Sequence, residues 1–129
     1  MENKKYFIEF ANNCLGVISK MYEINWTTNK QLTHERSHSI AWQTIDVVDN
    51  VMEAYIGLVG KGVINEGDIV PTVYGLTGFA DVIADFKEKI VKFKKFLTSQ
   101  NNPEYDAISS SIDTFISQTL VNIYKEDFE

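Results

Sequence analysis

The chain of 129 residues contains a single cysteine, two prolines and no long uncharged apolar run. One cysteine excludes a disulfide within the chain, and Cys14 lies in a periodic apolar stripe, where we expect a small buried side chain. The first ten residues, MENKKYFIEF, hold no continuous apolar region like that of a signal peptide. No stretch is long and apolar enough to cross a bilayer. We therefore expect a cytoplasmic protein that does not enter a membrane.

Positive charge is also scarce, with 12 lysines and arginines against 18 aspartates and glutamates and a net charge of −6 at pH 7. Autonomous nucleic-acid binding needs a basic face, so we expect no direct contact with nucleic acid. One basic cluster is interleaved with apolar residues at helical spacing, and its members are Lys87, Lys89, Lys92, Lys94 and Lys95. This pattern is typical of a solvated helix face opposite a core stripe.

Apolar residues recur at the spacing of amphipathic helices in four segments. We predict helices over about residues 2–24, 30–59, 77–99 and 103–125. Gly60 and Gly62 end the second helix, and Asn102 as N-cap with Pro103 at the first position begins the fourth. No strand-type alternation extends over a useful length. The pattern predicts an all-α four-helix bundle in which residues 1–129 form a single domain.

The connections between these helices differ in length. The first and second helices, and the third and fourth, are joined by short links, which predict two antiparallel hairpins. The connection over residues 60–76 is long, and at ~3.3 Å per residue it could run the length of the bundle. It therefore permits, without demanding, a crossover between parallel helices, as in ferritin-like bundles.

The second helix is apolar on two sides when residues are placed at steps of roughly 100°. We take as its core stripe His34, His38, Ala41, Trp42, Ile45, Val48, Met52, Tyr55, Ile56 and Val59. A second apolar group consists of Ile40, Val47, Val51, Ala54 and Leu58. A helix that is apolar on two sides has two neighbours to contact, and one of them could be another subunit. We therefore predict a homo-oligomer that forms through this helix.

Asp49 and Glu53 fall within or at the edge of that core stripe, where a carboxylate is costly to bury unless it is paired or bound to metal. They lie one turn apart, at ~6 Å along the axis, so they could share one ion. His34 lies ~22 Å from Asp49 along the helix and can join the pair only from a second, antiparallel copy. The same carboxylates could instead form a structural network with His34, Arg36 or lysines.

The stretch from Asn25 to Gly57 resembles miniferritins, the DNA-protecting ferritin-like proteins of starved cells. It resembles more closely the short ferritin-like proteins of unassigned function that are frequent in bacteriophage genomes. The family pattern is His-Trp, a second His, Asp-x-x-x-Glu and a nearby Gly. The corresponding residues of this chain are Asn25-Trp26, His34, Asp49, Glu53 and Gly57.

The resemblance implies a ferritin-like bundle and, as in miniferritins, an inter-subunit site that oxidises ferrous iron. Its metal ligands would be His34, Asp49 and Glu53, with His38 as a substitute fourth ligand. Asn25 stands where the family has its first histidine, and an amide is a poorer iron ligand than an imidazole. This departure indicates a degenerate site.

Three functions are compatible with these residues. We favour a structural or protein-interaction bundle without a cofactor, in a phage particle or the cytoplasm of an infected cell. The second is a working iron-binding or ferroxidase protein, and the third is a small protein that binds a host factor. The sequence holds no phosphate loop, no cysteine-rich zinc pattern and no credible nucleophile, so we predict no catalytic residue.

Overall fold

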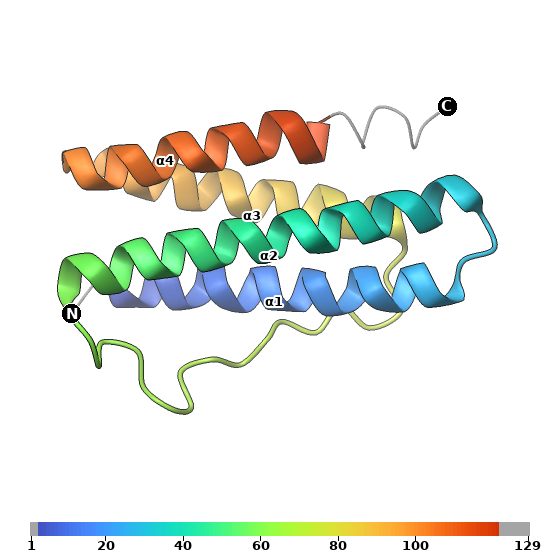
Figure 1. Cartoon of the computed structure of the whole chain (residues 1–129), viewed down its shortest axis with the longest axis horizontal. Coiled ribbons are helices and arrows are strands. Elements are labelled where there is room, and N and C mark those ends of the chain that lie inside the picture. The colour runs from blue at the N-terminus through green and yellow to red at the C-terminus, as the bar shows by residue number, and fades with distance from the viewer. Residues whose placement is uncertain (1–2, 122–129) are drawn as a thin grey trace.

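The computed structural model describes residues 3–121, which form four main helices and, within that range, no strand (Figure 1). The helices are α1 (Lys4–Thr27), α2 (Gln31–Val59), α3 (Phe79–Ser99) and α4 (Pro103–Phe115), and α4 continues as a π-helical stretch over Ile116–Val121. The prediction of an all-α protein with four helices is confirmed. The predicted start of the first helix at residue 2 and the end of the fourth at residue 125 lie outside the described residues.

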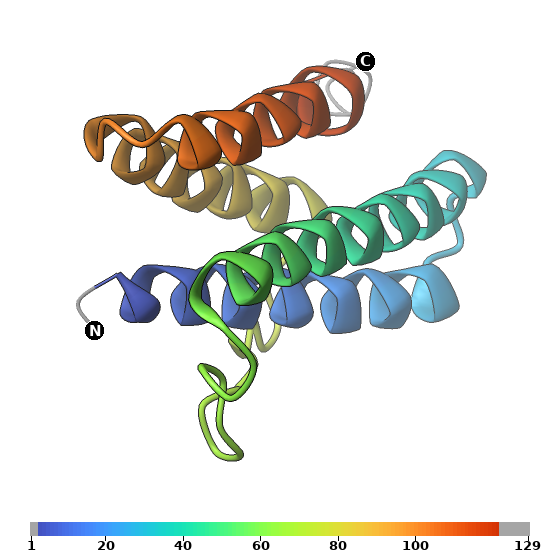
Figure 2. The same cartoon turned by 60° about the vertical axis from the view of Figure 1, so that its left-hand side comes forward.

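The helices pack as a bundle with α2 and α3 on one diagonal. α1 packs against α2 and α3, and α4 packs against the same two helices. The short links make α1–α2 and α3–α4 antiparallel hairpins, whereas α2 and α3 run in the same direction (Figures 1 and 2). Every pair of neighbouring helices is therefore antiparallel.

The connection between α2 and α3, residues 60–78, is a crossover that runs along α1. About half-way along it, Asp68 forms an ion pair at 2.9 Å with Lys4, at the beginning of α1. Near its end, the carbonyl of Gly75 accepts a hydrogen bond from Lys20 at 2.6 Å. The crossover that the sequence permitted is thus present, and it brings the chain back so that α3 starts at the same end of the bundle as α2.

Gly16 lets the crossover lie directly on α1. A Cβ at Gly16 would lie 2.2 Å from the carbonyl oxygen of Thr72, so no larger residue fits there without displacing the crossover. Two hydrogen bonds of Thr72 itself hold this contact. The Thr72 amide donates to the carbonyl of Asn12 at 3.0 Å, and its hydroxyl donates to the side chain of Asn13 at 2.8 Å.

Apolar residues at helical spacing predict one core stripe on each of α1, α3 and α4, and the structure buries most of each. On α1 the predicted residues are Phe7, Phe10, Cys14, Val17, Ile18 and Met21, of which only Ile18 is half-buried. Ile123, predicted for the fourth stripe, lies outside the described residues. On α3 the buried residues are Val82, Ile83, Phe86, Ile90, Phe93 and Leu97, and only Phe79 of the predicted stripe is half-buried. Cys14 of α1 is fully buried, and burial raises the pKa of its thiol well above the usual range. On α4, Tyr105, Ile108, Ile112 and Phe115 are buried as predicted. Aromatic stacking joins the helices, as between Phe7 and Tyr55 with ring centroids 3.9 Å apart.

The predicted orientation of α2 is wrong. Its buried residues are Arg36, Ser37, Ile40, Ala41, Thr44, Val47, Val48, Val51 and Tyr55. The bundle therefore buries most of the second apolar group, whereas the predicted core stripe contributes only Ala41, Val48 and Tyr55. The polar residues Ser37 and Thr44 lie in the middle of the buried side of α2. The spacing of apolar residues alone therefore does not mark this side as buried.

Candidate site on the outer face of α2

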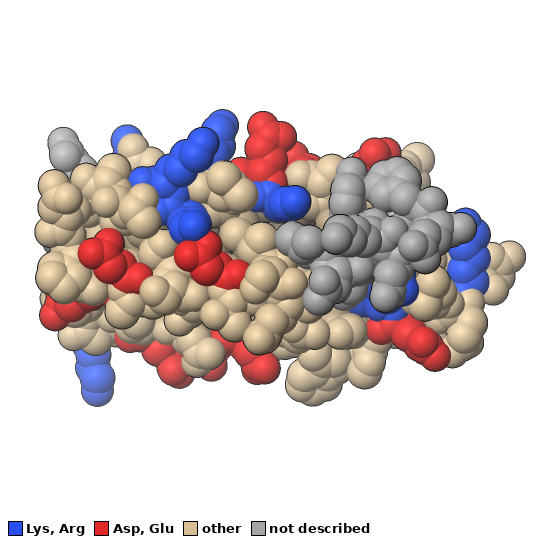
Figure 3. All heavy atoms as spheres, turned by 90° about the horizontal axis from the view of Figure 1, so that it is seen from above, with Lys and Arg blue, Asp and Glu red and all other residues tan. Residues whose placement is uncertain are grey.

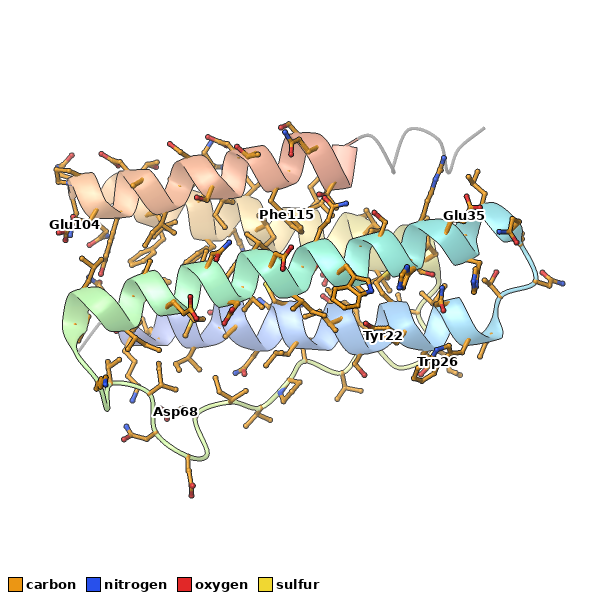
Figure 4. All side chains as sticks on the ribbon, viewed as in Figure 1. Tyr22, Trp26, Glu35, Asp68, Glu104 and Phe115 are labelled. Atoms are coloured by element: carbon orange, nitrogen blue, oxygen red, sulfur yellow. The ribbon has the colours of Figure 1, made fainter. Side chains whose placement is uncertain are left out.

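All four predicted metal ligands lie on the side of α2 that points away from the core. We define the outer face of α2 by His34, His38, Trp42, Ile45, Asp49, Met52, Glu53 and Ile56. Every one of these residues is exposed or half-buried. The face continues toward the end of α1, where the rings of Tyr22 and Trp26 lie 5.7 Å apart and Trp26 is 77% exposed (Figure 4).

His34 and Asn25 join the end of α1 to the start of α2. The Asn25 side-chain amide donates to the backbone carbonyl of His34 at 2.7 Å, and His34 Nδ1 lies 2.9 Å from the backbone carbonyl of Asn25. Because a carbonyl only accepts, Nδ1 carries a proton. Ser37 adds a second hydrogen bond to the His34 carbonyl at 3.1 Å. We call the two reciprocal hydrogen bonds between Asn25 and His34 the hairpin clasp.

The clasp gives Asn25 a structural role at the position where the resembling family has a histidine ligand. Asn25 is buried, and its amide nitrogen is used in the clasp. His34 is exposed, and its Nε2 makes no hydrogen bond with the described residues. Donation of one ring nitrogen to a carbonyl is the arrangement that orients histidine ligands in metal sites. His34 therefore suits a metal, whereas Asn25 does not.

His38 is engaged by its neighbour one turn along. The indole Nε1–H of Trp42 donates to His38 Nε2 at 2.7 Å, so this nitrogen carries no proton and its lone pair is used. Trp42 itself is 54% exposed. To serve as a substitute ligand through Nε2, His38 would first have to release Trp42.

Asp49 and Glu53 are exposed, so neither carries the burial penalty expected from the sequence. Neither forms a hydrogen bond or an ion pair with another described side chain, and the alternative network with His34, Arg36 or lysines is not seen for them. Within residues 3–121, no three His, Cys, Asp or Glu side chains come together as a metal would require. The four predicted ligands thus do not come together within one chain.

An apolar groove lies beside the outer face, between α1, α2 and the crossover. Its volume is about 360 Å³, and it is lined by Ala11, Leu15, Ile18, Ile45, Val48, Asp49, Met52, Ile56, Ile64 and Ile69. Asp49 is the one charged residue in this lining. We call this groove the α1–α2 groove. The groove was not predicted from the sequence, where Ile18 counts toward the core stripe of α1 and Leu15 beside it was the signal of a second apolar surface.

Comparisons of the chain with protein-family models, with curated proteins and with solved structures find no match. The resemblance to miniferritins and phage ferritin-like proteins therefore stays a prediction from residues 25–57. A separate test of the described helices finds none with the length and apolarity needed to span a membrane.

Proposed function

We propose that the protein is a ferritin-like helical bundle that acts as a structural or protein-interaction component of a phage particle or infected cell. It would associate with copies of itself through the outer face of α2. The observation that carries this proposal is the apolar surface that the bundle leaves uncovered there, from Trp42 along the α1–α2 groove. Large contiguous apolar patches are rare on the surface of monomeric proteins, and where they occur they mark interaction sites.

The energetics favour covering this surface. Each apolar side chain removed from water contributes roughly 25 cal/mol per Å², and the groove offers several such side chains in one concave place. The three half-buried residues Ile45, Met52 and Ile56 are spaced along α2 so that a partner helix could contact all of them. The single long crossover between parallel helices supports the ferritin-like part of the proposal.

Light scattering over a range of protein concentrations tests the association. We expect an oligomer that Met52→Asp dissociates, because the substitution places a charge in the apolar contact. Ser110→Asp adds the same charge at an exposed position of α4 and should leave the oligomer intact. A wild-type protein that stays monomeric at every concentration would overturn the proposal.

An iron site between two subunits is the alternative that the clasp favours. The orientation of His34 would let its Nε2 meet Asp49 and Glu53 of an antiparallel copy. Ferrous iron would then be the substrate, held by one imidazole and two carboxylates. Titration with ferrous iron should show binding and oxidation that His34→Gln abolishes and His38→Gln leaves in place. Equal iron binding by wild type and His34→Gln would rule this alternative out.

A further inference from the structure

The outer face of α2 is acidic as well as apolar. Asp49 and Glu53 are exposed, and residues 37–59 contain no lysine or arginine. The face therefore carries two carboxylates and no lysine or arginine. Two copies that met through α2 across a two-fold axis would bring these like charges toward one another. Like charges facing each other at a contact are unfavourable.

α3, which lies across the bundle from α2, carries the complementary charge. Figure 3 shows several lysines along its upper edge, with carboxylates among them, and further carboxylates along its lower edge. Lys89 pairs with Asp85 at 3.0 Å, and Lys94 pairs with Asp113 of α4. Lys92 and Lys95 are exposed, and no carboxylate among residues 3–121 lies within ion-pairing distance of either.

Lys89 and Lys92 border a groove whose lining includes aromatic residues, which we call its aromatic floor. This groove of about 450 Å³ between α1 and α3 is lined by Tyr6, Glu9, Phe10, Asn13, Lys89, Ile90, Lys92 and Phe93. Phe10 and Phe93 stack in it with ring centroids 4.4 Å apart. We call this the α1–α3 groove. The lining contains one carboxylate, Glu9, and two lysines, Lys89 and Lys92.

We propose that copies of the chain join head to tail, with the outer face of α2 docked on the lysine edge of α3 and the α1–α3 groove of the next copy. Carboxylates of one copy would meet Lys92 and Lys95 of the other, and apolar α2 side chains would meet the aromatic floor. This inference rests on the proposed function for the role of α2 and adds the receiving surface. Because the two surfaces differ, a pair of copies still has one free surface of each kind, so association continues into a ring or a filament.

Charge reversal tests the receiving surface. Lys92→Glu with Lys95→Glu should weaken self-association by about tenfold or more, and Asp49→Lys with Glu53→Lys should do the same. An equimolar mixture of the two variants should assemble again, because each then offers the charge that the other lacks. Light scattering and sedimentation at low and high salt measure these effects. Salt should weaken the wild-type assembly, since exposed charges are screened.

A charge-matched control separates this contact from a general effect of net charge. Lys30→Glu with Lys61→Glu reverses two exposed lysines near the ends of α2 and should leave assembly unchanged. Assembly unaffected by the α3 reversal, together with loss on the α2 reversal that wild type restores, would overturn the head-to-tail contact and leave an α2–α2 contact. A monomeric wild type would overturn the proposed function as well.

Discussion

α2 and α3 lie across the same diagonal of the bundle, yet they use their apolar residues differently. α3 buries six of the seven apolar residues predicted for its core and turns lysines to solvent. α2 has apolar residues on two sides and buries one of them, with Ser37 and Thr44 fully buried among the apolar residues. Its other side holds Trp42 at 54% exposure. The two helices thus differ in how much of their apolar surface the bundle covers.

The difference shows what a core stripe means in a bundle. A helix with one apolar side has one way to bury it, so its sequence predicts its orientation. A helix with two apolar sides has two ways, and the bundle satisfies only one of them. The residues of the other side then stay exposed or half-buried. The following experiments test this contrast, from the largest expected effect to the smallest.

The largest effect should come from truncating the buried side of α3. Phe86 is fully buried, and Phe86→Ala should lower the free energy of unfolding by about 3–5 kcal/mol because it leaves a cavity. Met52→Ala on the outer face of α2 should change it by less than about 1 kcal/mol in the monomer. Urea unfolding at low protein concentration measures both. Comparable losses at the two positions would show that the outer face is part of the core.

Two glycines within helices should respond with opposite signs. Gly16→Ala places a methyl group 2.2 Å from the Thr72 carbonyl and should destabilise by about 1–3 kcal/mol as the crossover shifts. Gly57 of α2 has nothing within 4 Å of a built Cβ. Gly57→Ala should therefore stabilise the monomer by about 0.5–1 kcal/mol through helix propensity. Thermal unfolding compares the two, and stabilisation by Gly16→Ala would contradict the close approach of the crossover.

The hairpin clasp should make a smaller contribution. Asn25→Ala removes the donor to the His34 carbonyl and should cost about 1 kcal/mol, since Ser37 still bonds that carbonyl. Asn29→Ala, at an exposed position in the neighbouring link, is the matched control and should be neutral. Nitrogen NMR of the His34 ring provides a second readout. We expect Nδ1 to stay protonated in wild type and to lose this preference if the clasp opens.

The contact of the crossover with α3 should show at alkaline pH. Burial, and then the neighbouring Asp85, raise the pKa of Tyr74 above the usual value for tyrosine. The folded protein therefore keeps the Tyr74 proton where the unfolded chain loses it. The contribution of Tyr74 to stability is complete below a pH of ~10 and falls as the pH rises beyond it. Tyr74→Phe should reduce this fall, with Tyr22→Phe as the control, and an identical pH profile in all three proteins would refute the assignment.

Much of the fold could be predicted because its signals are local. Asn102 and Pro103 mark the start of α4, where the Asn102 side chain accepts a hydrogen bond from the amide of Glu104 at 2.9 Å. Gly60 follows the last residue of α2 with a φ of 123°, which only glycine adopts readily. The candidate site was harder to predict. The sequence placed His34, Asp49 and Glu53 on one face correctly, but it could not show that this face is turned outward.

By itself the sequence determined four helices, their hairpin links, a crossover long enough to span the bundle and the core stripes of α1, α3 and α4. Each of these follows from the spacing of residues along one segment. Only the tertiary structure decided which side of α2 is buried, why α1 needs Gly16 and how Asn25 meets His34. These features depend on where the other segments lie. Periodicity gives the angle of a side chain about its own helix axis, and the packing of all four helices decides what that side chain meets.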